Sequence, residues 1–170
     1  MFLYRFISVA VLVFWVGGLL ALGGIVAPQV FATLGAHDPV AGRTLAGAVF
    51  GAVLGQFLNW TSILGSGVWL ILAVRAVVGP RPRWVAGRLG LLTLMLAASV
   101  YTGRILAPRI EAIRLATPAG MTTLAESDPV RMEFGRLHGL SNGLMLATLV
   151  LGSVLLWMEI TSSPQPRPPS

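Results

Sequence analysis

One uncharged apolar stretch limits the folds open to this chain more than any other feature of the sequence. No charged residue occurs between Arg43 and Arg75, and the segment Leu45–Leu72 reads LAGAVFGAVLGQFLNWTSILGSGVWLIL. About 20 apolar residues are enough for a helix to cross the hydrocarbon layer of a bilayer. In lipid every backbone polar group must be paired within the segment, which a helix achieves. The stretch therefore predicts a transmembrane helix that is longer than the bilayer requires.

The composition is that of a membrane protein. Hydrophobic residues make up 55% of the 170 residues and charged residues only 11%. The chain has no cysteine, which excludes disulfides, thiolate metal sites and a cysteine nucleophile. The formal charge of +6 comes from arginines at the ends of apolar segments, and no basic stretch carries interleaved aromatic residues. We therefore expect no nucleic-acid partner.

Apolar segments and helix-start signals divide the chain into four helices. Asp38 and Asp128 are suited to the N-cap, and each is followed by a proline that fits the first helical turn. A kink is expected at Pro108. We predict one domain over residues 1–160 with helices at about 6–34, 39–78, 84–116 and 129–160, a short turn at 79–83, and a disordered tail at 161–170.

An internal duplication links the two halves of the chain. Ile25–Ala32 (IVAPQVFA) matches Ile105–Ala112 (ILAPRIEA), and a DPV triplet follows each copy. Leu-Gly-Ser then recurs at residues 64–66 and 151–153. The predicted fold class is thus all-α, a four-helix transmembrane bundle of two similar hairpins forming a parallel internal repeat.

The positions of the charges predict where the membrane lies. Arg88 and Arg104 are 16 residues apart, or roughly 24 Å along a helix, so both can reach an interface by snorkelling. By this placement all four helices extend past the outer interface on the same side and form a water-exposed cap. Four arginines crowd the short connection after the second helix, at positions 75, 81, 83 and 88. The positive-inside rule then places both termini in the cytoplasm.

Small residues recur every four positions in the second helix, at Gly47, Gly51 and Gly55. This spacing puts them on one helix face, where they permit close approach of a second helix. We interpret the face as a packing surface within the bundle. The alternative is a homodimer formed through the same face.

A cluster of polar residues is predicted at the outer interface: Gln56, Asn59, Tyr101, Arg104, His138, Ser141 and Asn142. Such residues commonly hydrogen-bond between helices or anchor them at the interface. The sharper hypothesis is a ligand site open to the outer face. His138 is the candidate axial ligand of a b-type haem, with Met145 two turns further along the helix. Two histidines and no cysteine make a transition-metal site less favoured, and no cofactor is expected. No hydrolase triad, P-loop or Rossmann fingerprint is present, which favours a non-enzymatic protein.

Three motifs resemble a known family: Trp15–Phe31 (WVGGLLALGGIVAPQVF), Ala41–Phe50 (AGRTLAGAVF) and Phe134–Ser141 (FGRLHGLS). They are similar to the bacterial domain of unknown function 4149, which is grouped with eukaryotic transmembrane protein 205. The resemblance covers about Val9 to Trp157 and implies a four-helix protein of the bacterial inner membrane without an established activity. The family tends to carry an asparagine two turns after the histidine, where this chain has Met145. A more distant similarity to copper-resistance-D and HemJ-type proteins implies histidine-bound haem.

Three functions follow as hypotheses. The first is a multi-pass membrane protein whose outer polar cluster binds a small ligand, a lipid or a protein partner. The second is a haem or metal redox protein that uses His138. The third is a small transporter or export component, which the repeat supports; the absence of acidic residues deep within the spans argues against it.

Overall fold

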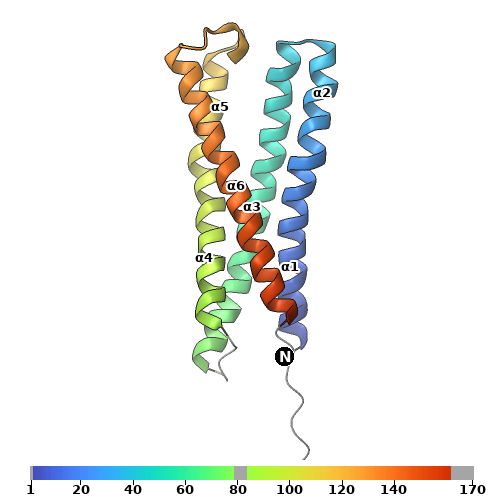
Figure 1. Cartoon of the computed structure of the whole chain (residues 1–170), viewed down its shortest axis with the longest axis vertical. Helices are drawn as coiled ribbons and strands as arrows, with labels where there is room; N and C mark the ends of the chain where they lie inside the picture. The colour runs from blue at the N-terminus through green and yellow to red at the C-terminus, as the bar shows by residue number, and fades with distance from the viewer. Residues whose placement is uncertain (1, 79–83, 162–170) are drawn as a thin grey trace, which may run out of the picture.

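The computed structural model of the protein describes residues 2–78 and 84–161, and four long helices account for nearly all of them (Figure 1). Each of the four is long and apolar enough to cross a membrane. No strand occurs in the described residues, so the predicted all-α, four-helix transmembrane bundle is confirmed. The predicted turn at 79–83 and nearly all of the predicted tail, residues 162–170, lie outside the described residues.

The first and third long helices have the same composite build. The first consists of α1 (Phe2–Ala21), the π-helical turn η1 (Leu22–Val26) and α2 (Ala27–His37). The third consists of α4 (Val85–Tyr101), the π-helical turn η2 (Thr102–Leu106) and α5 (Ala107–Ala116). The second and fourth are single α-helices, α3 (Ala41–Val78) and α6 (Pro129–Thr161), and a short 3₁₀ turn, η3 (Met121–Thr123), precedes α6.

The two π-helical turns have one physical cause. Pro28 and Pro108 lack a backbone N–H, and in a regular α-helix each ring would press on the carbonyl four residues earlier. The wider turn relieves this clash, and its bonds run from Ala27 N–H to Leu22 O and from Ala107 N–H to Thr102 O. The helix thus continues past Pro108 through a widened turn. Because both turns precede the matched Ala-Pro pairs, the structure repeats where the sequence repeats.

The aspartates at the helix starts act as the sequence predicts. Asp38 Oδ1 accepts hydrogen bonds from the backbone N–H groups of Val40 and Ala41, each at 2.8 Å. Asp128 Oδ1 accepts one from Val130 N–H at 2.8 Å. These bonds pair backbone donors that the first turn of a helix leaves without an intrahelical partner. Both predicted N-caps are confirmed.

The proximal end, where Phe2 and Thr161 lie, is the tightly packed part of the bundle (Figure 1). There α1 and α4 each pack against both α3 and α6. The buried core consists of Leu12, Trp15, Leu19, Val68, Leu72, Leu92, Met95 and Leu155. A Cβ at Gly65 would lie 2.5 Å from the Trp15 ring, and one at Gly152 would lie 2.7 Å from Val16. Both glycines of the repeated Leu-Gly-Ser motif are therefore positions of close approach in the core.

Arg88 differs from the predicted arrangement. Its side chain turns inward, with 4% of the residue exposed, and its Nη1 lies 3.2 Å from Oε1 of Glu159. A second guanidinium nitrogen donates to the carbonyl oxygen of Met158 at 3.0 Å. The sequence placed Arg88 at the interface by snorkelling, but an acidic partner on α6 allows the charge to be buried instead.

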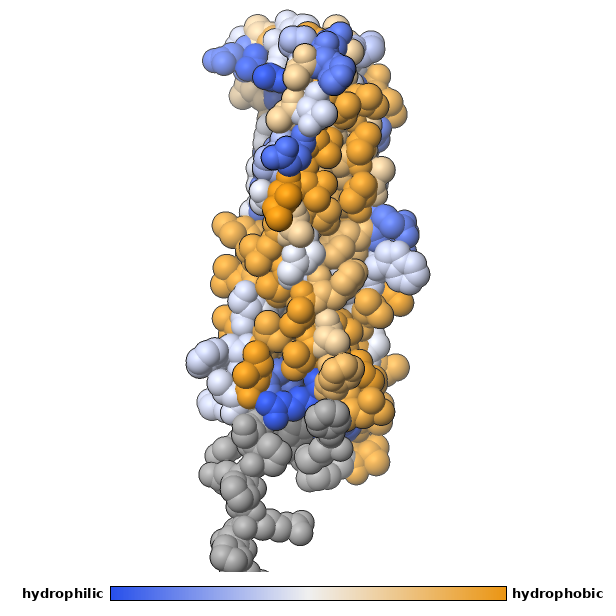
Figure 2. All heavy atoms as spheres, turned by 90° about the vertical axis from the view of Figure 1, so that its right-hand side faces the viewer, coloured by the Kyte–Doolittle hydropathy of each residue, from blue (hydrophilic) through white to orange (hydrophobic). Residues whose placement is uncertain are grey.

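Apolar side chains dominate the outer surface of the bundle. Figure 2 shows them over most of one face, with the largest group of hydrophilic residues at the distal end, the end farthest from Phe2 and Thr161, and smaller groups at mid-height and at the proximal end. The four spans contain 32 to 38 residues. Helices of that length measure roughly 48–57 Å, against about 30 Å of hydrocarbon. Each helix is thus long enough to extend well beyond a bilayer.

Candidate functional site

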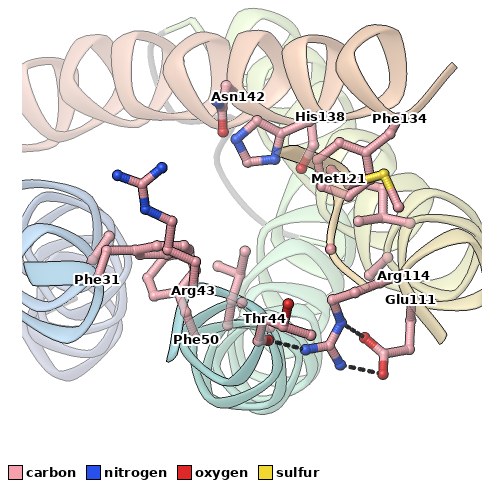
Figure 3. Close-up of a pocket in the computed structure, with 18 of the residues that line it drawn as sticks. Phe31, Arg43, Thr44, Phe50, Glu111, Arg114, Met121, Phe134, His138 and Asn142 are labelled. Carbon is pink, nitrogen blue, oxygen red and sulfur yellow. Dashed lines mark hydrogen bonds and ion pairs between the residues drawn. The ribbon is translucent and has the colours of Figure 1, made fainter. Parts of the chain in front are cut away.

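A cavity of about 580 Å³ lies in the distal half of the bundle, where the two hairpins separate (Figure 3). Its walls come from η1, α2, α3, η2, α5, α6 and the connection between α5 and α6. Neither α2 nor α5 contains a fully buried residue, in contrast to the proximal helices. The volume falls in the range of small-molecule sites in proteins. The bundle is therefore solid at the proximal end and hollow at the distal end.

The cavity is apolar at depth and charged at its rim. Its deep end is lined by Gly23, Ala27, Leu54, Thr102 and Met145. Aromatic rings of Phe31, Phe50 and Phe134 form part of the walls. The rim nearest the distal end carries Arg43, Glu111 and Arg114. Such a gradient suits an elongated molecule with an apolar body and a polar group at one end.

Arg114 closes one side of the cavity, the seam between α3 and α5. Its Nη1 donates to the carbonyl oxygen of Thr44 on α3 at 2.6 Å. Its Nε donates to Oε2 of Glu111 at 2.9 Å, and its Nη2 pairs with Oε1 of the same carboxylate. These contacts appear as dashed lines in Figure 3. A bidentate, charge-assisted arrangement fixes the guanidinium firmly, so it ties α5 to α3.

The connection between α5 and α6 covers the same side. Gly120 has a φ of +89°, a backbone conformation that glycine adopts without strain. A Cβ at this position would lie 3.1 Å from Cγ1 of Val40. The backbone angle therefore favours glycine here, and any larger residue would press on Val40 just before α3. This contact brings Met121 and Thr122 onto the cavity wall.

The opposite seam, between α2 and α6, has no such tie. Among the described residues, α2 packs extensively only against α3, where a Cβ at Gly42 would lie 1.9 Å from Leu34 O. Arg43 stands at this seam: Figure 3 shows its guanidinium extending from α3 towards α6, on the side of Asn142. It makes no hydrogen bond or ion pair with any described residue. The cavity is therefore flanked by one closed seam and one open seam.

A polar strip on α6 faces the cavity. His138, Ser141 and Asn142 all line it, and none forms a side-chain hydrogen bond within the described residues. The His138 ring stacks on Phe134, with centroids 5.9 Å apart and planes 5° from parallel. This stacking fixes the plane of the imidazole and leaves its nitrogens for water or a ligand. Within the described residues, no group of three or more acidic or histidine side chains is placed to hold a metal ion.

The structure divides the predicted polar cluster into two sets. His138, Ser141 and Asn142 line the cavity, whereas Gln56, Asn59, Tyr101 and Arg104 are exposed on the outside of the bundle and do not line it. The second set is suited to anchoring at a membrane interface, where tyrosine and arginine are common. Among the described residues, the seven do not converge on one site.

The glycine face of α3 borders the cavity. Gly47 and Gly51 line it, and nothing lies within 4 Å of where a Cβ of Gly51 or Gly55 would be. Gly47 is near only the Arg114 side chain, at 3.7 Å. In the described chain no second helix presses on these glycines, so their small size keeps the cavity open. The homodimer remains a prediction.

Comparison with known families gives one match. The family model described as a domain of unknown function, DUF4149, matches residues 10–118. That range begins within α1, covers α2 to α5, and ends before α6, which carries His138. No curated protein and no solved structure matches the chain.

Proposed function

Because the chain belongs to the DUF4149 family, whose function is unknown, we propose a function from its own geometry: it binds a small amphiphilic molecule in the distal cavity without catalysing a reaction. The observation that carries the proposal is the cavity of about 580 Å³ with an apolar deep end and a charged rim. Small-molecule sites combine such apolar walls with a few converging polar groups. Arg43, His138 and Asn142 supply those groups.

The arrangement of polar groups favours binding over chemistry. The lining has no nucleophile hydrogen-bonded to a base among the described residues, and the carboxylate of Glu111 is held by Arg114. General acid–base catalysis needs a positioned proton donor and acceptor within hydrogen-bond reach of a reacting group. His138 alone does not supply such a pair. Recognition of a ligand needs only the groups that are present.

A cavity-filling variant tests the proposal. Gly51→Leu projects a side chain into the cavity at a position where nothing lies within 4 Å of the added Cβ, so the fold should persist. Gly67→Leu is the matched control, because Gly67 lies on the same helix, is exposed, has equal space and does not line the cavity.

The measurement is mass spectrometry of small molecules that co-purify with protein extracted in lipid nanodiscs. We expect a bound amphiphile in the wild type and in Gly67→Leu, and its loss from Gly51→Leu. Equal amounts in all three proteins would contradict binding in the cavity.

Haem is the second candidate, and the observation favouring it is that His138 faces a cavity that also has Met121 on its wall. Axial ligation by histidine alone or with methionine is common for b- and c-type haems. An absorption spectrum of protein from haem-supplied cells decides the matter. A Soret band that His138→Ala removes would establish haem, and a spectrum without one would exclude it.

A further inference from the structure

The open seam between α2 and α6 gives the cavity a side entrance. Residues from both sides line the cavity along this seam: Gly23 of η1 with Ala27 and Phe31 of α2 on one side, and Ser141, Asn142 and Met145 of α6 on the other. The predicted outer edge of the hydrocarbon layer is marked by the outward-facing residues Gln56, Asn59, Tyr101 and Arg104. Leu54, which lies at the deep end, or floor, of the cavity, is at the same depth. The floor end of the seam therefore lies next to the outer leaflet, where a lipid can enter, and the rest of the seam lies in the predicted water-exposed cap.

The charge of the lining selects the head group. Glu111 and Arg114 neutralise each other through their bidentate pair, which leaves the formal positive charge of Arg43 unbalanced. Arg43 is exposed, and its stem passes α2, since Cγ lies 3.7 Å from where a Cβ of Gly35 would be. A guanidinium binds carboxylate or phosphate oxygens through two parallel N–H donors. An anionic group at the rim can therefore accept hydrogen bonds from the guanidinium N–H groups of Arg43, which no described residue occupies.

The length and size of the cavity select the rest of the ligand. Arg43 and Leu54 lie eleven residues apart on α3, or roughly 16 Å along the helix. The walls between them are mostly apolar, which disfavours a free inorganic anion in the deep part. The volume suits one molecule of drug-like size.

We propose that the cavity takes a single-chain lipid with an anionic head from the membrane, that its chain enters between α2 and α6, and that Arg43 binds the head. This inference rests on the proposed function and adds the class of the ligand. The chain of the lipid points to the floor and its head points to the distal rim. Asn142 and His138 then lie along the path of the molecule and can hydrogen-bond to its head or to a polar group near it.

The experiment uses the full chain in nanodiscs of zwitterionic lipid. The probe is a long-chain carboxylate that carries a photoreactive diazirine, and labelled peptides are identified by mass spectrometry. The competitors are dodecanoate, dodecanol and inorganic phosphate. The variants are wild type, Arg43→Gln, Gly51→Leu and the control Arg109→Gln; Arg109 is an exposed arginine on α5 that does not line the cavity. Thermal unfolding verifies that each variant is folded.

We expect labelling of peptides from α3 and α6 that line the cavity, competition by dodecanoate, and none by phosphate. Arg43→Gln should weaken dodecanoate competition about tenfold, since a hydrogen-bonded charged partner contributes about 1.5–3 kcal/mol and 1.4 kcal/mol is tenfold. Dodecanol competition should be the same in Arg43→Gln and wild type, and Arg109→Gln should resemble wild type throughout.

Other outcomes separate the two proposals. If dodecanol competes as well as dodecanoate in the wild type and Gly51→Leu abolishes labelling, cavity binding stands and the anionic-head assignment fails. If phosphate competes as strongly as dodecanoate, the site is one for free anions and the lipid assignment fails. If labelling is unchanged in Gly51→Leu, the cavity is not the binding site and the proposed function itself fails.

Discussion

At the distal end, the seam between α3 and α5 and the seam between α2 and α6 occupy matching places in the two-hairpin repeat, but they differ in their contacts. The first is bridged by the hydrogen bond from Arg114 to Thr44 O and by the contact of Gly120 with Val40. The second has no bridging hydrogen bond in the described residues, and Arg43 stands there without a partner. At the distal end, the two hairpins are therefore bridged at one of these two seams only.

The difference follows from changes at matched positions of the repeat. The offset of 80 that aligns Pro28 with Pro108 places Leu34 in the position of Arg114. Leucine has no donor that can reach across to α6. The connections differ as well, because three residues separate α2 from α3 whereas twelve separate α5 from α6. Only the longer connection can fold over the cavity wall. A duplicated hairpin therefore produces an asymmetric site once one copy loses or gains a single bridging side chain.

The largest expected effect concerns the seam between the first helix and α6, which is open distally and closed proximally. In Gly152→Leu the added Cβ would lie 2.7 Å from Val16 and 3.0 Å from Met95. Overpacking of a core typically costs about 1–3 kcal/mol, and more where the backbone must shift. We expect loss of the folded monomer, measured by size-exclusion chromatography and thermal unfolding in detergent.

The control for this variant lies on the same helix. Gly143→Leu has nothing within 4 Å of its added Cβ and is exposed. It should fold as the wild type does. If Gly152→Leu were equally well tolerated, the proximal seam would not be closed, and the contrast between the two ends of α6 would be lost.

The next effect concerns the tie across the closed seam. Arg114→Ala removes the bridge to Thr44 O and frees the half-exposed Glu111 carboxylate, which water can then solvate. We expect a loss of about 1–2 kcal/mol in the free energy of unfolding, at the lower end for hydrogen bonds to charged groups. Arg109→Ala, on the same helix but outside the cavity, should change little.

Spin-label distances test the same variant directly, and the absence of native cysteine makes site-specific labelling simple. Labels at Val49 and Leu115 report on the α3–α5 seam, and labels at Thr33 and Met132 report on the α2–α6 seam. Arg114→Ala should broaden the first distance distribution to resemble the second. A distribution that stays narrow would show that the tie does not hold the seam closed.

The fold was largely predictable because it depends on local signals. Long apolar runs fix the helices, and Asp38 and Asp128 fix two helix starts. The site was less predictable, since it depends on which way a side chain points. Counting residues from the flanking charges placed Gln56 and His138 at one depth, but only the rotation of each helix decides that His138 faces inward and Gln56 outward.

The rim residues were missed for a related reason. Arg43 and Arg114 resemble ordinary solvated charges in the sequence, and their contrast emerges only when the hairpins are packed together. One signal was present for Arg43: it follows the start of α3 closely, where the helix dipole does not favour a cation. The sequence also leaves open what lies beside Gly47 and Gly51, because a small residue allows either a closely packed helix or an empty space.

The smallest effect concerns the cap that positions α2 beside the open seam. Hydrogen bonds from the N–H groups of Val40 and Ala41 lower the pKa of the Asp38 carboxyl below its ordinary value. The ionised carboxylate therefore stabilises the fold at pH values above the pKa of the unfolded chain, and this contribution is lost as the pH falls through the lowered pKa of the folded state. Asp38→Ala should lower the Tm slightly at neutral pH and have no effect at strongly acidic pH. Because α2 is held mainly by α3, the same change should broaden the Thr33–Met132 distance distribution and leave the Val49–Leu115 distribution unchanged. Broadening of both would mean that the two seams move together, which would contradict the independence of the open seam from the Arg114 tie.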